Sequence, residues 1–178
     1  MERMQDEGLA DHLERASPLT DKEKTAVQEI WAKVFINSDD VGVAILVRFF
    51  TKYPKSKQYF NQFKDSEVEE LKHSAQFRKH AGRVMNALNT MVESLDNSEK
   101  LESLLKLIGK SHALRHKVEP VYFKKLSEAI LEILEEAFPE VKTTEVRTAW
   151  IKLLAVICCG VSAVYEEEGW TKLSTSTG

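Results

Sequence analysis

The chain has 178 residues, which is enough for one domain with a sizeable core. Hydrophobic residues make up 43% of it and charged residues 30%, as in an ordinary soluble globular protein. The net charge is only −3 and no run of five or more basic residues occurs, which argues against nucleic acid or an anionic membrane as the main partner.

Apolar residues recur with helical period along nearly the whole chain, and no alternating strand pattern appears. Residues 1–17 are polar and predict a flexible extension. Thr20, with Glu23 three residues later, is a capping box that opens the first long helix. A polar break at 37–40 starts a second helix, which ends at Pro54. These features predict two consecutive helices.

Pro54 can also begin a short helix, because proline fits the first helical turn. Residues 64–74 are charged and predict a loop or a one-turn helix. A long helix is expected over about 74–95. Residues 96–98 then close this helix and cap the next one, which ends near His116.

Pro120 opens another helix, and Pro139 stops it before a last long helix. The Thr/Ser/Gly-rich tail 171–178 is expected to be flexible. The longest uncharged run, 153–165, is shorter than the roughly 20 residues that span a bilayer. Because the N-terminus also lacks an apolar signal segment, we expect a cytoplasmic protein without stable membrane insertion, with the nucleus as a second location.

Two histidines lie on apolar helix faces that otherwise predict core. His80 shares its face with Phe77, Val84, Ala87, Leu88 and Met91, and His112 shares its face with Leu101, Leu104, Leu105 and Ile108. One histidine on such a face is usually a core residue with satisfied hydrogen bonds. Two of them, with a Phe-rich segment before the first, favour a flat apolar cofactor held between two imidazoles, which indicates haem.

Six or seven substantial helices with short links leave two architectures open, an up-down bundle and the globin fold. A bundle needs four similar long helices, whereas this chain also has a very short proline-initiated one. Over 18–170 the chain resembles the globin family through the order of Trp31, Pro54, Phe60, Phe63, His80, Val84, His112, His116, Pro120 and Phe123. Within that family it is similar to fish-like vertebrate cytoglobins, at segments 41–50, 57–60, 86–90 and 111–123. The resemblance implies an all-α globin fold of about seven to eight helices that encloses haem b.

The resemblance makes His112 the proximal ligand of the haem iron, a role that suits a neutral imidazole nitrogen. The other ring N–H needs an acceptor, and both the Ile108 carbonyl and the Ser111 hydroxyl are within reach. His80 is expected to be the distal histidine and the catalytic residue of any haem chemistry. It would donate a hydrogen bond to O2, and in cytoglobin-like proteins this residue can also ligate the iron directly.

The other pocket residues follow from the same resemblance. Phe60 and Phe63 are expected against the porphyrin, Leu46 and Val84 on the ligand side, and Val118, Tyr122 and Phe123 on the proximal side and interior edge. Arg83 and His116 lie on the right helix faces to meet the haem propionates, with Arg115 as an alternative. For Arg83 and His116, an ordinary solvated side chain stays the competing interpretation.

Cys158 and Cys159 are adjacent, and successive helical residues point about 100° apart, so an internal disulfide is disfavoured. Two reduced thiols are favoured, and a redox or intermolecular role stays open. Many cytoglobins carry two cysteines where this chain has Ser38 and Gly82. A thiol switch of that form is therefore not expected here.

Two functions would use these residues. The first is reversible binding of O2, and also of NO and CO, for storage, transfer or sensing. The second is enzymatic: NO dioxygenation, or nitrite, superoxide or peroxide chemistry. It needs an external electron donor, because the chain has no G-x-G-x-x-G and no flavin or nicotinamide domain. A haem-free helical scaffold would leave the two histidines unexplained. We expect a monomer or a homodimer.

Overall fold

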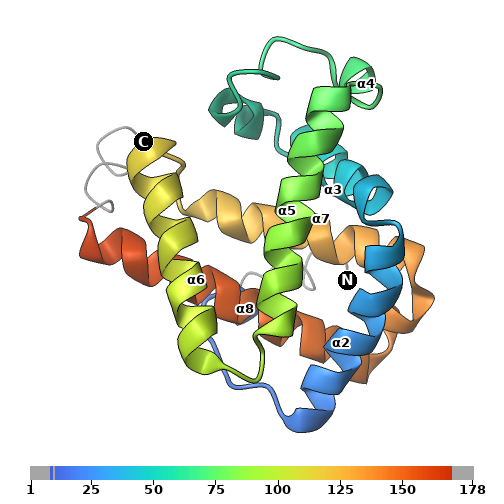
Figure 1. The fold of residues 1–178 in the computed structure, drawn as a ribbon, viewed down its shortest axis with the longest axis vertical. Helices are drawn as coiled ribbons and strands as arrows, with labels where there is room; N and C mark the ends of the chain where they lie inside the picture. Colours follow the sequence, from blue (N-terminus) through green and yellow to red (C-terminus); the bar gives the residue numbers. More distant parts are fainter. Residues whose placement is uncertain (1–8, 10, 170–178) are drawn as a thin grey trace.

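The computed structural model describes residues 9 and 11–169, which contain helices and no strand (Figure 1). The long helices are α2 (Asp21–Ile36), α3 (Ser38–Lys52), α5 (Ala75–Glu93), α6 (Ser98–Lys110), α7 (Val121–Ala137) and α8 (Thr144–Glu167). The short helical segments are η1 (Pro54–Tyr59), α4 (Val68–Leu71), η2 (Ser111–Arg115) and η3 (Pro139–Lys142). The all-α prediction is confirmed.

Local capping signals define the ends of the helices. The Thr20 hydroxyl accepts a hydrogen bond from the Glu23 backbone N–H at 3.2 Å, and Glu23 Oε1 accepts from the Thr20 N–H at 2.8 Å. This pair is the predicted capping box at the start of α2. Asn97 caps α6 by accepting from the Lys100 N–H at 3.1 Å. Pro54 is the first residue of η1, as its fixed φ angle favours.

The predicted flexible extension differs from the structure where the two overlap. Residues 9 and 11–13 are helical, and Leu9 and Leu13 are 6% and 0% exposed. Glu14 then forms an ion pair with Lys124 of α7, with Nζ and Oε1 2.9 Å apart. The polar composition of this segment concealed two leucines four residues apart, which share one helix face. Residues 1–8 and 10 of the extension and the tail 171–178 lie outside the described part of the chain.

The helices form one packed body in which distant segments lie against each other (Figure 1). α3 packs on α5 and α7, α6 packs on α8, and α2 contacts both α5 and α8. In the view of Figure 1, α5 crosses in front of α7 and α8. The Trp31 indole N–H donates to Asn89 Oδ1 at 2.8 Å and so links α2 to α5 in the interior.

Two helix crossings are unusually close because a glycine lies at each. On α3, a Cβ built at Gly42 would lie 2.8 Å from Met85 Cγ and 3.1 Å from the Ala81 carbonyl oxygen of α5. On α8, a Cβ built at Gly160 would lie 2.6 Å from Leu105 Cδ1 of α6. Real Cβ atoms do not approach other atoms so closely. At Gly42 a larger residue would meet the backbone of α5 and push the two helices apart, whereas at Gly160 the end of the Leu105 side chain would have to shift. The two crossings hold α5 and α6, the helices that lead to the two histidines.

α8 is long and apolar enough to cross a membrane by length and composition alone. However, 61% of its apolar stretch is buried inside the fold. Trp150 of α8 is 1% exposed, and its ring lies 6.2 Å from that of Trp31. α8 is therefore the central core helix of this packed body.

We predict that Leu13→Ala lowers the free energy of unfolding by about 2–4 kcal/mol, because it leaves a cavity at a fully buried site. Urea denaturation followed by circular dichroism measures the change. The matched control is Leu107→Ala on α6, whose side chain is 69% exposed, and it should shift stability by no more than about 0.5 kcal/mol. Equal effects of the two substitutions would show that the N-terminal segment does not belong to the core.

Candidate functional site

His112 lies just after α6, in a segment where the backbone widens into a π-helical turn. The His116 N–H donates to the Ser111 carbonyl at 3.1 Å, five residues back, and such turns occur frequently at functional sites. His112 Nδ1 lies 2.8 Å from the Ile108 carbonyl oxygen. Because a carbonyl only accepts, Nδ1 carries the proton and Nε2 keeps its lone pair. Of the two predicted acceptors, the structure selects Ile108.

Burial keeps the His112 ring neutral. Desolvation lowers the pKa of His112, against a smaller opposing effect of the hydrogen bond to Ile108. The ring stacks edge-on against Phe123, with centroids 5.2 Å apart and planes at 71°. The result is a neutral imidazole of fixed orientation with a free nitrogen, which is the form that binds a metal.

His80 lies on α5 and is enclosed by aromatic rings. Its ring centroid is 5.2 Å from that of Phe60 at 90°, and 5.9 Å from that of Phe63 at 67°. Burial is the main cause that lowers the pKa of His80, followed by the charges of Arg83, His112 and His116. His80 is therefore a second neutral imidazole, and the residues after α6 act on it electrostatically.

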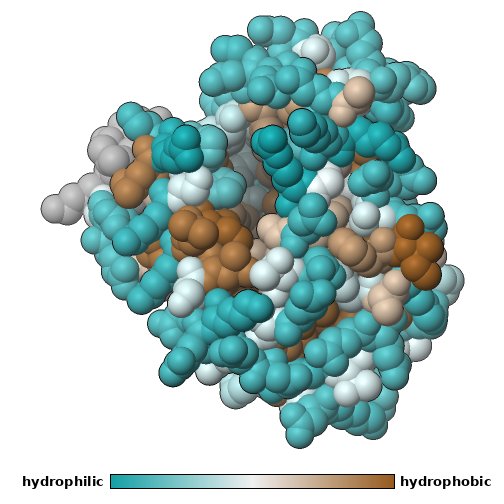
Figure 2. All heavy atoms as spheres, in the orientation of Figure 1, coloured by the Kyte–Doolittle hydropathy of each residue, from teal (hydrophilic) through white to brown (hydrophobic). Residues whose placement is uncertain are grey.

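A small apolar cavity of about 70 Å³ lies beside His112. Its lining consists of aromatic and aliphatic side chains with a single histidine: Phe49, Tyr59, Phe60, His112, Val118, Tyr122, Phe123 and Leu126. Figure 2 shows that the surface is hollowed between α5 and α6. α5 carries His80, and α6 leads into the turn that carries His112. An apolar space with few polar groups suits a largely hydrophobic ligand.

The predicted pocket residues fall into two groups in the structure. Phe60, His112, Val118, Tyr122 and Phe123 line the cavity together. Three others lie outside the cavity lining: Leu46 is buried on α3, Phe63 is buried after η1 with its ring 5.9 Å from that of His80, and Val84 is half-buried on α5, the helix of His80.

Three lining residues were not predicted from the sequence. Phe49 lies three residues after Leu46 on α3, and Leu126 lies three residues after Phe123 on α7. Residues three apart share a helix face, so extending the predicted faces by one turn would have found both. Tyr59 precedes Phe60 at the end of η1, where no helical period indicates which way a side chain points.

The charged residues expected at the propionates lie on the solvent side. Arg83, Arg115 and His116 are exposed. The His116 ring is 5.5 Å from the His112 ring, and the Arg83 charge lowers the pKa of His80. The exposed guanidinium groups of Arg83 and Arg115 stay in solvent, where they could meet acidic groups at a cavity mouth.

The two cysteines are free and take part in other contacts. Cys158 is buried with its Sγ 3.3 Å from the Ser127 hydroxyl, and burial raises its pKa to about 11. Cys159 Sγ lies 3.6 Å from the Leu13 carbonyl oxygen. The predicted absence of a disulfide between them is confirmed, and neither thiol lines the cavity.

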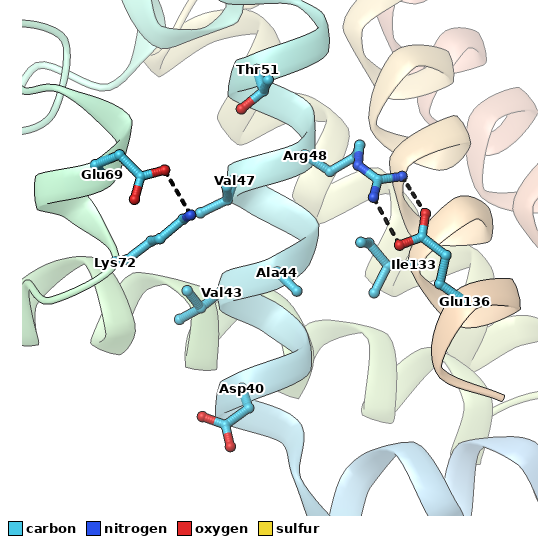
Figure 3. A pocket seen from close by; sticks show the side chains of 10 residues that line it. All are labelled: Asp40, Val43, Ala44, Val47, Arg48, Thr51, Glu69, Lys72, Ile133 and Glu136. Atoms are coloured by element: carbon cyan, nitrogen blue, oxygen red, sulfur yellow. Dashed lines mark hydrogen bonds and ion pairs between the residues drawn. The ribbon is translucent and has the colours of Figure 1, made fainter.

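A larger groove of about 640 Å³ lies on the outer face of α3, between α4 and α7 (Figure 3). Its charged groups are already paired: Arg48 bonds Glu136 with N–O distances of 2.7 and 2.9 Å, and Lys72 bonds Glu69 at 2.8 Å. It contains no histidine. The cavity beside His112 is therefore the better candidate for chemistry.

The residues present fit a haem better than a metal ion bound directly by the protein. Within the described residues, no three His, Cys, Asp or Glu side chains form a group that could hold a metal ion. His112 instead offers one free nitrogen toward an apolar space, and His80 offers a second imidazole. One or two imidazoles are what an iron needs when a planar apolar ring supplies its other ligands.

Comparison with known proteins finds relatives over the full length of the chain. A sequence model of the family described as Globin matches residues 43–161. Cytoglobin-1 of Oryzias latipes is 63% identical over 178 residues, and Cytoglobin-2 of Danio rerio is 51% identical over 177 residues. Each match covers 99% of this chain and 99% of the relative. Hemoglobin subunit pi of Gallus gallus is 36% identical over 147 residues, covering 83% of this chain and 98% of the relative.

We predict that the ligand-free chain loses stability as the pH falls through the ordinary histidine pKa of about 6.5. Burial lowers the pKa of His80 and His112, so the unfolded chain binds more protons there than the folded chain does. The free energy of unfolding therefore decreases toward lower pH. Urea titrations between about pH 7.5 and 5.5 should show a smaller decrease for His112→Gln than for the parent chain. His73→Gln, which changes an exposed histidine, is the control, and identical slopes for all three chains would contradict the prediction.

Proposed function

The chain belongs to the globin family, and on this premise we propose that it is an intracellular haem protein that reversibly binds O2, with His112 as the proximal iron ligand. The predicted globin fold and the resemblance to fish cytoglobins are confirmed. When bound, the haem supplies an iron that takes up gas molecules and exchanges electrons. Residues of the chain hold the haem and contact the bound gas.

The observation that carries the proposal is the orientation of the His112 ring. Its Nδ1–H donates to the Ile108 carbonyl at 2.8 Å, which directs the unprotonated Nε2 away from the helix backbone. Hydrogen bonding of the second nitrogen fixes the tautomer and raises the basicity of the ligating one. The Phe123 ring packs against one side of the imidazole, with the ring centroids 5.2 Å apart, so the imidazole is already oriented without the iron.

His80 serves as the distal residue in this proposal. Because burial keeps it neutral, one ring nitrogen can donate a hydrogen bond while the other can accept a proton or a metal. A donor toward O2 contributes about 1.5–3 kcal/mol when the acceptor carries partial negative charge. Leu46 on α3 has no hydrogen-bonding group, so His80 is the donor expected on that side.

We further propose that His80 can ligate the iron itself and so compete with gas molecules. Phe60 and Phe63 pack edge-on against its ring, and His80 is a half-buried imidazole on α5 that would serve as a second ligand when the iron is bound. If the open form were about 1% populated, the apparent affinity for an external ligand would fall about 100-fold. NO and CO would face the same competition as O2.

The cofactor we propose is haem b, which is held without covalent bonds to the protein. Haem attached through thioethers needs cysteines at its edge. Here Cys158 contacts Ser127 and Cys159 contacts the Leu13 carbonyl, so neither sulfur is directed into the cavity. We propose a cytoplasmic monomer or homodimer.

A second candidate function is redox chemistry at the same site: NO dioxygenation, or reaction with nitrite, superoxide or peroxide. The observation that favours it is the presence of two oxidisable phenols, Tyr59 and Tyr122, in the cavity lining. Such chemistry requires an external reductase or small reductant, because this chain carries no motif for a flavin or nicotinamide.

We predict that the purified chain binds haem and that His112→Ala loses or misplaces it. Absorption spectra of the ferric form and of the dithionite-reduced form without O2 measure this directly. Sharp, split visible bands after reduction indicate an iron with both histidines bound, and one broad band indicates an open site. His73→Ala, which changes an exposed histidine just beyond α4, should retain the parent spectrum. Normal haem content in His112→Ala would refute the proximal assignment.

We predict that His80→Leu raises the apparent affinity for CO, because the internal competitor is gone. The same variant should release O2 faster, because its hydrogen-bond donor is also gone. Flash photolysis measures the binding of CO, and stopped-flow mixing measures the rate at which O2 is released. His73→Leu is the control, since His73 is exposed just beyond α4. An unchanged CO affinity in His80→Leu would mean that His80 does not compete for the iron.

A further inference from the structure

A buried pair of polar side chains joins α7 to α8 one helical turn beyond Phe123. Ser127 of α7 is 4% exposed and Cys158 of α8 is 1% exposed, and Ser127 Oγ lies 3.3 Å from Cys158 Sγ. Neither side chain takes part in the proposed function so far. Because a buried polar group is costly unless it is hydrogen-bonded, the bonds of this pair indicate its role.

The donor in each bond of this pair can be assigned. The Ser127 hydroxyl lies 2.8 Å from the Phe123 carbonyl oxygen, and a carbonyl only accepts, so Ser127 donates its one hydrogen there. The other bond must then use the hydrogen of the thiol, and Cys158 donates to Ser127 Oγ. Burial raises the pKa of Cys158 to about 11, which keeps the thiol protonated at neutral pH. Two consecutive hydrogen bonds therefore run from α8 to the backbone of α7.

These two bonds end at the residue whose ring packs against His112. Phe123 is the third residue of α7, and its ring centroid lies 5.2 Å from that of His112, with the planes at 71°. A serine side chain that bonds the carbonyl four residues back often bends a helix at that point. The direction of the first turn of α7 therefore depends on the Ser127 hydroxyl, and Cys158 ties this hydroxyl to α8.

α8 also contacts the segment that leads into α7. The Tyr165 ring centroid lies 6.1 Å from that of Phe123, and the Tyr165 hydroxyl donates to the Val118 carbonyl at 2.7 Å. Tyr165 and Cys158 are both 1% exposed, so these contacts come from the buried face of α8. Because α8 is the central core helix, it provides a rigid reference for the Phe123 ring.

We propose that Ser127 and Cys158 are positioning residues of the proximal site, which hold the Phe123 ring against His112 and so set the orientation of the imidazole toward the iron. This inference rests on the proposed function. Groups that contact a ligating imidazole orient its ring and so tune its bond to the metal. Neither side chain lines the cavity, so the pair acts on the bond between iron and His112 through Phe123.

A pair that only stabilised the fold would behave differently. Its removal would lower the free energy of unfolding and leave the bond between iron and His112 unchanged. A positioning pair must change that bond in protein that is folded and loaded with haem. The iron–histidine stretching band in the resonance Raman spectrum of ferrous haem reports this bond directly.

The experiment uses the full-length, haem-loaded protein in its ferrous form without O2, with His80→Leu in every chain so that His80 cannot bind the iron. We expect Ser127→Ala and Cys158→Ala to shift and broaden the iron–histidine band, because the imidazole orientation is less narrowly fixed. Cys158→Ser keeps a hydrogen-bond donor at this position and should retain the band of the parent chain.

Cys159→Ala is the matched control. Cys159 is the neighbouring thiol on α8, but its Sγ contacts the Leu13 carbonyl oxygen at 3.6 Å. This variant should keep the parent band, even if urea denaturation shows lower stability. An unchanged band in both Ser127→Ala and Cys158→Ala, or an equal shift in Cys159→Ala, would overturn the inference.

The remaining outcomes separate this inference from the proposed function. Absorption spectra report the haem content of every chain. A parent chain that binds no haem would overturn the proposed function and, with it, this inference. If Ser127→Ala does not retain haem, the two variants of Cys158 decide. A band that moves in Cys158→Ala and not in Cys158→Ser supports the inference, and equal bands in the two overturn this inference alone.

Discussion

The close approach of helices at two glycines is the constraint on which the site depends. At Gly42 the backbone of α3 meets α5, and at Gly160 the backbone of α8 meets α6. α5 carries His80, and α6 leads directly into the turn that carries His112. A larger side chain at Gly42 would meet the backbone of α5 and shift His80 relative to His112, because packed interiors transmit small displacements.

Burial between these helices decides the chemical state of both imidazoles. Neither His80 nor His112 has a carboxylate among the causes of its pKa shift, so desolvation dominates and the rings stay neutral. Neutral imidazoles can ligate iron or donate to a bound gas, whereas protonated ones cannot ligate. The charged residues Arg83 and Arg115 remain exposed, so the interior stays apolar where a porphyrin would lie.

Charged and hydroxyl side chains join α3 to α7 along one seam. Glu128, Glu132 and Glu136 are four residues apart and so lie on one face of α7. Arg48 binds Glu132 at 2.9 Å and also Glu136, as Figure 3 shows in part, while Tyr53 binds Glu128 one turn further along. The ion pairs hold α3 against α7, and the same contact places a carboxylate at the phenol of Tyr53.

The sequence by itself determined the features that depend on neighbours along the chain. Helical period, the Thr20 capping box and the prolines were enough to predict the helices. The two histidines could be recognised as candidates because they lie on otherwise apolar helix faces. Only the tertiary structure decided features that depend on contacts between distant segments. These are the burial of Leu13, the inclusion of Tyr59 in the cavity lining and the carboxylate beside Tyr53. The physical reason is that burial and hydrogen-bond partners arise from segments 60 to 146 residues apart, which no local pattern encodes.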